Sequence, residues 1–183
     1  MVNDLPKEYL EVIGAISIDF AFLERMLIRI ISQSAGANIH VIERLVVNDS
    51  FEVLLFKFKK LFIFRYHYFG LDKDDKELIK EFDSLIDCLY TINRRRNKLI
   101  HAIWLTDKNG QIVRHKYRRS IKKDPSIDDR QTITLEYFKD FLKEIYDNTI
   151  LLLRFKRKII KLFSVLDSEI RNIIYDYIKD KEK

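Results

Sequence analysis

The sequence predicts an all-α fold: a helical bundle of four or five long helices, with a small β-hairpin inserted before the last long helix. Of the 183 residues 47% are hydrophobic, and only 4 are Gly and 2 are Pro. So few turn-forming residues exclude collagen, low-complexity linkers and most β-sandwiches. Apolar residues also recur at steps of three and four over long stretches, which is the period of an amphipathic helix. We expect one domain over residues 1–183.

A first long helix is predicted over residues 6–34. Pro6 is suited to a first helical turn, and Gly36 is suited to the position just after a helix ends. A short helical piece is expected to follow around residues 38–47.

The second long helix is expected to begin after Asp49 and Ser50, which are both good capping residues, and to run to about Tyr68. It is apolar almost all round, so we expect it to be buried on more than one side, in the core or against another subunit. Its last part alternates aromatic residues with cations (Lys60–Phe69). Such a pattern is also found on surfaces that stack nucleic-acid bases, but core or subunit contact is the simpler interpretation.

A third helix carries an apolar stripe that runs from Leu78 to Leu99. Residues 102–119 then combine β-forming residues with an Asn-Gly pair, which predicts the hairpin. The last helical stretch starts near Thr134. Its pattern leaves open whether residues 164–179 continue this helix or form a separate one.

Positive charge is concentrated in one part of the chain. The net charge is +6, but residues 94–123 contain eleven Lys or Arg and one acid, Asp107. This segment therefore carries +10, and the other 153 residues together carry −4. A basic segment on an otherwise acidic chain is typical of a protein that binds a polyanion such as RNA. The alternative is a solvated basic surface without a partner.

The sequence also predicts the cellular compartment of the protein and whether it needs a metal or a cofactor. Cys88 is the only cysteine, which excludes an intrachain disulfide and a cysteine-based zinc cluster, and it is expected to be a small core residue. No run of 18 apolar residues is present, so no membrane contact is expected. The first residues include an acid instead of the basic residues of a signal peptide, which favours a cytoplasmic protein. We expect no metal and no cofactor.

Three polar residues near the end of the third helix are the candidate catalytic residues. Arg96 continues the apolar stripe, so a permanent cation points towards the interior. Burying a cation is costly unless it pairs with an acid or has a functional role. His101 lies about 7.5 Å further along the helix and about 140° around it. Asn97 shares the helix face of His101. In the alternative, structural interpretation, Arg96 pairs with a buried acid, His101 caps the helix and Asn97 bonds locally.

Glu24 is the candidate supporting residue, because it lies within the apolar face of the first helix. A carboxylate at this position would orient the guanidinium of Arg96. The alternative is a glutamate at the edge of the apolar stripe that faces solvent.

The segment Arg96-Asn97-Lys98-Leu99-Ile100-His101 resembles the motif of the HEPN family, which is Arg, a polar residue, three further residues and His. The layout is similar too, since the family has a compact helical bundle with the motif near the end of a late helix. The resemblance implies a metal-independent endoribonuclease that acts as a homodimer, with the motifs of both subunits facing one cleft. One role for such an enzyme is that of a toxin or phage-defence effector, with an antitoxin or regulatory protein as partner.

The resemblance also implies a role for each residue. His101 would take the proton of a ribose 2′-hydroxyl, and Arg96 would stabilise the charge that develops on the attacked phosphate. The expected RNA-binding residues are the surrounding cations: Arg94, Arg95, Lys98, Arg114, Lys116, Arg118 and Arg119. Two other functions fit the same sequence. One is a HEPN-like module that binds RNA or protein without cleaving RNA, and the other is a structural adaptor whose basic segment contacts an acidic protein.

Overall fold

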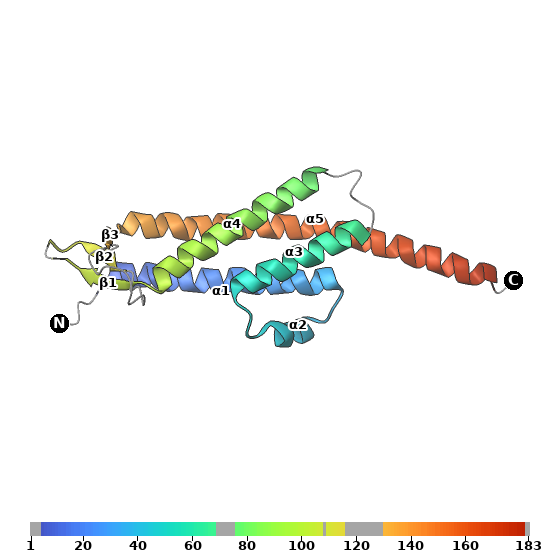
Figure 1. Cartoon of the computed structure of the whole chain (residues 1–183), viewed down its shortest axis with the longest axis horizontal. Helices are drawn as coiled ribbons and strands as arrows, with labels where there is room; N and C mark the ends of the chain where they lie inside the picture. The colour runs from blue at the N-terminus through green and yellow to red at the C-terminus, as the bar shows by residue number, and fades with distance from the viewer. Residues whose placement is uncertain (1–4, 69–75, 108, 116–129, 182–183) are drawn as a thin grey trace, which may run out of the picture. The chain divides into compact units, whose positions relative to one another are not determined.

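The computed structural model describes residues 5–68, 76–107, 109–115 and 130–181. Within these residues the chain forms five helices and three short strands, which confirms the all-α prediction (Figure 1). The helices are α1 (Lys7–Ala35), α2 (Ile39–Val46), α3 (Phe51–Tyr68), α4 (Lys76–Ile100) and α5 (Leu135–Lys181). None of these helices is long and apolar enough to span a bilayer.

The chain forms two compact units. The first unit contains residues 1–23 and 89–148, and the second contains residues 24–88 and 149–183. Helices α1, α4 and α5 contribute residues to both units. The expectation of one domain over the whole chain stays a prediction.

The predicted ends of α1 match the structure to within one residue. Gly36 has a φ of 62°, a left-handed conformation that glycine adopts without strain. The backbone N–H of Ala37 donates to the carbonyl of Ser32 (3.0 Å), and that of Gly36 donates to the carbonyl of Gln33 (3.2 Å). These two bonds form a Schellman motif, which satisfies carbonyl groups at the end of the helix.

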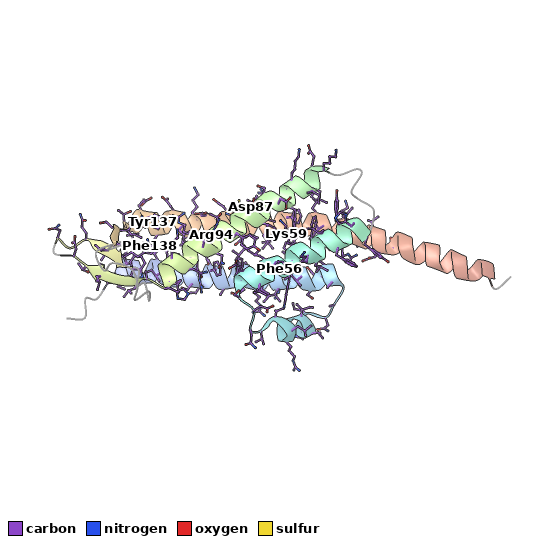
Figure 2. All side chains as sticks on the ribbon, in the orientation of Figure 1. Phe56, Lys59, Asp87, Arg94, Tyr137 and Phe138 are labelled. Atoms are coloured by element: carbon purple, nitrogen blue, oxygen red, sulfur yellow. The ribbon has the colours of Figure 1, made fainter. Side chains whose placement is uncertain are left out.

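Helix α3 begins where its capping residue was expected, since the Ser50 hydroxyl accepts a hydrogen bond from the backbone N–H of Val53 (3.3 Å). Its buried side chains line one side of the helix: Phe51, Leu54, Leu55, Phe58, Phe62 and Tyr66. Other large apolar side chains are exposed: Val53, Phe56, Phe64 and Tyr68. Figure 2 labels Phe56 among them. Burial on more than one side within the core is therefore not found, and burial against another subunit stays a prediction.

An aromatic cluster around Phe62 forms the core of the second unit. The Phe62 ring stacks on Phe82 of α4 (3.9 Å between centroids, 23° between planes). It also contacts Phe155 and Phe163 of α5, at centroid distances of 5.6 and 6.4 Å. One side chain thus holds three helices together.

Arg65 lies one turn from Phe62 on α3 and forms hydrogen bonds to α1 and to α5. Its Nη1 donates to the carbonyl of Ser34 at the end of α1 (2.8 Å), and its Nη2 donates to the carboxylate of Asp167 on α5 (2.6 Å). Its guanidinium also lies over the Phe163 ring, 4.5 Å from the centroid. A half-buried cation is here neutralised within the protein.

The strands β1 (Ile103–Thr106), β2 (Ile112–His115) and β3 (Arg130–Thr132) form one antiparallel sheet in the order β1-β2-β3. The Asp107 carboxylate accepts hydrogen bonds from the backbone N–H groups of Asn109 and Gln111, both at 2.8 Å. Gly110 has a φ of 77°. The predicted hairpin is therefore confirmed.

Three features of the chain differ from the prediction or complete it. Strand β3 was not expected, because its three polar residues, Arg-Gln-Thr, carry no strand pattern; they pair with β2 in an antiparallel register. Helix α5 is continuous to Lys181, so residues 164–179 continue the last helix. Cys88 is exposed, which corrects its assignment to the core, because α4 turns this position to solvent between the buried Leu85 and Leu89.

Replacing Phe62 by Ala should remove the centre of the aromatic cluster. We expect the free energy of unfolding to fall by about 3–5 kcal/mol, because a fully buried Phe leaves a cavity that its neighbours fill only in part. Phe64 lies two residues further on the same helix but is 65% exposed, so Phe64→Ala should change the free energy by less than about 0.5 kcal/mol. Urea denaturation of both variants measures the difference, and equal losses would contradict this assignment of the core.

Candidate active site

The last turns of α4 in the first unit present a polar stripe to solvent. Arg94, Asn97, Lys98 and His101 are all exposed and follow the spacing i, i+3, i+4, i+7, which places them on one helical face. The helix ends at Ile100, but the backbone N–H of His101 still donates to the carbonyl of Asn97 (3.2 Å). His101 therefore continues the stripe by one residue. Figure 2 labels Arg94 at its beginning. We call these four residues the motif stripe.

Arg96 lies beside the motif stripe and is half-buried. Its guanidinium lies over the ring of Phe20 on α1, 4.9 Å from the centroid. Its Nη1 donates to the side-chain oxygen of Asn97 (3.0 Å), and so the guanidinium is held next to the stripe. Its Nε is buried without a hydrogen-bond partner among the described residues. No ion pair to a carboxylate is formed by Arg96 within the described part of the first unit.

Arg95, in contrast to Arg96, has a carboxylate partner inside the protein. It forms an ion pair with Glu144 on α5, donates from Nε to the hydroxyl of Tyr137 (3.1 Å) and lies over two rings. The guanidinium carbon is 4.3 Å from the centroid of Tyr137 and 4.7 Å from that of Phe141. Figure 2 labels Tyr137 on the first turn of α5. Arg95 was expected to bind RNA, but its charge and most of its surface are used by these contacts.

The end of α4 is fixed by Trp104, which the sequence did not single out. Its indole Nε1 donates to the carbonyl of the buried Leu99 (3.2 Å), which also accepts from the backbone N–H of Ala102 just after the helix (3.4 Å). Its ring packs on Phe138 of α5 at a centroid distance of 5.2 Å. Trp104 thus anchors the chain three residues after His101. A tryptophan just after a helix gives no sequence signal for such a cap, because the contact depends on the path of β1.

The cationic face expected on the hairpin is not found at Arg114. This residue lies in β2, is only 8% exposed, and its Nε has no hydrogen-bond partner among the described residues. Burial removes Arg114 from the surface on which RNA phosphates would lie, which corrects that expectation for this residue. Lys116, Arg118 and Arg119 lie outside the described residues.

Glu24 is half-buried on α1, next to the buried Leu23. It belongs to the second unit, whereas Arg96 belongs to the first. Its role as the residue that holds Arg96 stays a prediction.

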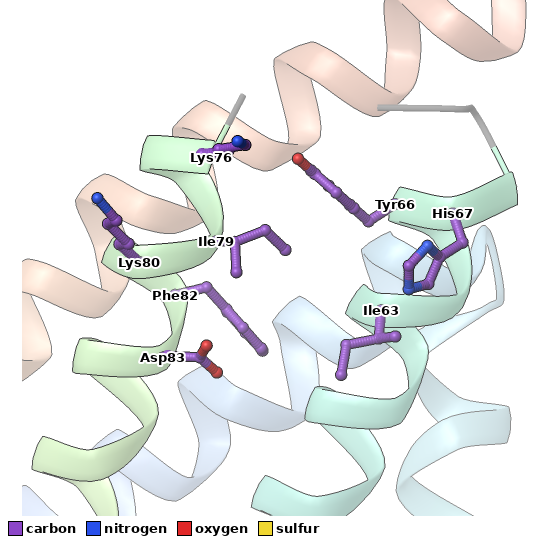
Figure 3. A pocket seen from close by; sticks show the side chains of 8 residues that line it. All are labelled: Ile63, Tyr66, His67, Lys76, Ile79, Lys80, Phe82 and Asp83. Atoms are coloured by element: carbon purple, nitrogen blue, oxygen red, sulfur yellow. The ribbon is translucent and has the colours of Figure 1, made fainter. Parts of the chain in front are cut away.

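Metal sites and cavities are two further kinds of site that the described residues could form. They contain no group of three or more His, Cys, Asp or Glu side chains that could hold a metal ion. The second unit has a cavity of about 500 Å³ between α3 and α4 (Figure 3). Its walls are formed by Ile63, Tyr66, His67, Lys76, Ile79, Lys80, Phe82 and Asp83. None of the expected site residues lines this cavity.

Comparisons of the chain with protein-family models, with curated proteins and with solved structures found no match. The interpretation of the motif stripe therefore depends on its own residues and their geometry.

The different environments of Arg94 and Arg95 predict different effects on stability. Arg95→Ala should lower the free energy of unfolding by about 1–3 kcal/mol, because hydrogen bonds to charged groups are lost and Glu144 is left without its partner. Arg94 is exposed, and its one hydrogen bond among the described residues is to Thr91 on its own helix, so Arg94→Ala should cost less than about 0.5 kcal/mol. Chemical denaturation followed by circular dichroism compares the two. A larger loss for Arg94→Ala would mean that α4 is rotated differently.

Proposed function

We propose that the chain is a metal-independent endoribonuclease of HEPN type that acts as a homodimer, with Arg96, Asn97 and His101 at its active site. The observation that carries the proposal is the state of Arg96. It is half-buried over Phe20 and has no carboxylate partner in the described part of the first unit. A half-buried cation is stabilised by nearby negative charge, so the position of Arg96 is suited to a substrate group on which negative charge develops.

Asn97 connects Arg96 to the exposed stripe. Its side-chain oxygen accepts the hydrogen bond from Nη1 of Arg96, and its backbone carbonyl accepts one from His101. One residue thus orients the cation and lies one helical turn before the imidazole. This arrangement supports a role for Asn97 in positioning the two catalytic side chains.

The reaction follows from what these groups do chemically. His101 removes the proton of a ribose 2′-hydroxyl, since an imidazole exchanges protons near neutral pH. The 2′-oxygen forms a bond to the adjacent phosphorus while the bond from phosphorus to the 5′-oxygen breaks. The leaving 5′-oxygen takes up a proton, for which the imidazole of the second subunit is the donor in a dimer. Arg96 stabilises the additional charge on the phosphate oxygens. The products are a 2′,3′-cyclic phosphate and a free 5′-hydroxyl.

The surroundings of the motif stripe support RNA as the substrate. Arg94 and Lys98 are exposed on the same face as His101, where they would contact phosphates on either side of the cleaved bond. Apolar side chains on α1 are exposed in the same unit, with Ile18 at 70% and Phe22 at 49%. Exposed apolar side chains one turn apart support a contact with a second copy of the chain. The role of toxin or phage-defence effector, with an antitoxin as partner, stays a prediction.

The proposed activity is tested by incubating the purified protein with single-stranded RNA in the presence of EDTA. We expect cleavage that leaves 2′,3′-cyclic phosphate ends. His101→Ala should lower the rate by about 10²–10⁴-fold through loss of the general base. Arg96→Ala should lower it by about 10²–10³-fold through loss of charge stabilisation. The matched control is His67→Ala, which removes an exposed histidine of the second unit and should leave the rate unchanged.

Cleavage that EDTA abolishes would contradict metal independence, and equal activity of all variants would point to a contaminating nuclease. RNA binding that survives both active-site substitutions without any cleavage would support the alternative of a non-catalytic binding module. Analytical ultracentrifugation of the same preparation should show a dimer, and activity of a strict monomer would contradict the proposed cleft.

Arg94 and Lys98 are tested by the salt dependence of RNA binding. Replacing both by Gln removes two phosphate contacts, so the slope of log K against log salt should become smaller in magnitude by about 1.4 for single-stranded RNA. Lys139→Gln with Lys143→Gln is the matched control, because it removes two exposed cations with the same spacing from α5. Fluorescence anisotropy with a 2′-O-methyl oligonucleotide, which cannot be cleaved through the 2′-hydroxyl, measures both slopes. Equal changes in the two slopes would show attraction to net charge only.

A further inference from the structure

The second unit contains a cavity of about 350 Å³ with a basic lining, far in sequence from the motif stripe. Its lining comes from α1, α2 and α5: Arg25, Arg29, Ser32, Gln33, Ile39, His40, Glu43 and Lys156. The volume lies within the range of about 300–1,000 Å³ that small-molecule sites occupy. We call this the basic cavity.

Three cations line the basic cavity, Arg25 and Arg29 with exposed side chains and Lys156 with a half-buried one. Arg25 and Arg29 are one turn apart on α1, and Lys156 lies on α5. None of the three forms an ion pair with a carboxylate among the described residues. Like charges spaced i, i+4 on a helix destabilise it, and a third cation adds to this repulsion. An anion in the cavity would be attracted to each of the three cations and would thereby offset their mutual repulsion.

The other polar groups of the cavity are compatible with an anion. Glu43 is the single carboxylate in the lining. Its Oε2 lies 3.4 Å from Nδ1 of His40, which also lines the cavity. Ile39 and His40 are the first two residues of α2, whose N-terminal end carries partial positive charge. The side-chain oxygen of Asn38 already accepts from the backbone N–H of His40 (2.9 Å). The end of α2 therefore contributes mainly through its dipole, and Arg25, Arg29 and Lys156 supply the direct contacts.

We propose that the basic cavity binds a phosphate group that carries two or more negative charges. The planar guanidinium groups of Arg25 and Arg29 match phosphate oxygens in pairs, and Lys156 adds a point charge from another helix. The free amide of Gln33 is a further donor on the same wall. The site uses no residue of the motif stripe, so it goes beyond the proposed ribonuclease activity and does not rest on it.

Two sources of such a phosphate are distinguished by the ligands in the test. Inorganic pyrophosphate represents a free, highly charged anion. A 2′-O-methyl trinucleotide with a 5′-phosphate, compared with the same trinucleotide with a 5′-hydroxyl, represents the end of a nucleic-acid strand. Isothermal titration calorimetry of the whole chain, at one fixed ionic strength, gives a dissociation constant for each ligand.

We expect saturable binding of pyrophosphate or of the 5′-phosphorylated trinucleotide, with a dissociation constant at least tenfold larger for Arg25→Gln with Arg29→Gln. The control is Arg157→Gln with Lys161→Gln, which removes two exposed cations of α5 with the same spacing and the same change in net charge. Its dissociation constant should stay within about twofold of the wild-type value, because its charges act only at a distance.

Absence of saturable binding by the wild-type chain would overturn the proposal, and so would equal weakening in the two double variants. Should the Arg25 and Arg29 variant unfold, Lys156→Gln serves in its place, with an expected weakening of at least threefold. Circular dichroism of each variant verifies that it is folded. Because the His101→Ala variant keeps the basic cavity, it should bind the phosphate ligand normally, so failure of the ribonuclease proposal and failure of this one are separate results.

Discussion

The rotation of α4 in the first unit is fixed by the buried Leu89, Ile92 and Leu99 together with the ion pair between Arg95 and Glu144. Arg95 is also covered by the rings of Tyr137 and Phe141, so it contributes dispersion contacts as well as charge neutralisation. Successive residues of a helix differ by about 100° in direction. Once Arg95 faces α5, its neighbour Arg96 must face α1 and Phe20, and the motif stripe must face solvent. This orientation of α4 therefore places Arg95 against α5, Arg96 over Phe20 and Arg94 in solvent.

The pairing state separates two groups among the arginines described above, whereas the buried Arg114 belongs to neither group. Arg65 and Arg95 each have a carboxylate partner and lie over aromatic rings, as expected for cations that hold helices together. Arg96 lies over a ring but has no carboxylate partner in the described part of its unit. Arg25 and Arg29 line a cavity in the same unneutralised state. The free energy of a desolvated or crowded cation is lowered by an anion, so these positions are where ligands of negative charge are proposed.

Much of the fold could be predicted because its signals are local. The periodicity of three and four residues located α1 and α4, Ser50 marked the start of α3, and the Asn-Gly pair marked the hairpin. Strand β3 could not be found in this way, since its pairing with β2 uses backbone groups that every residue possesses. The exposure of Cys88 could not be predicted from the pattern either. A residue between two apolar positions lies at the edge of the helical stripe, and an edge position can face either the core or solvent.

For the candidate site, the sequence by itself determined which residue types lie near the end of α4 and at what spacing: three arginines, Asn97 and His101. Spacing along a helix depends only on its fixed pitch, and so it can be read from the chain. The tertiary structure decided which arginine is neutralised, through Glu144 and Tyr137, which lie more than forty positions further along the chain. It also decided that Trp104 caps α4 and that Arg114 is buried. These outcomes depend on contacts between distant segments, and such contacts leave no mark in the local pattern of either segment.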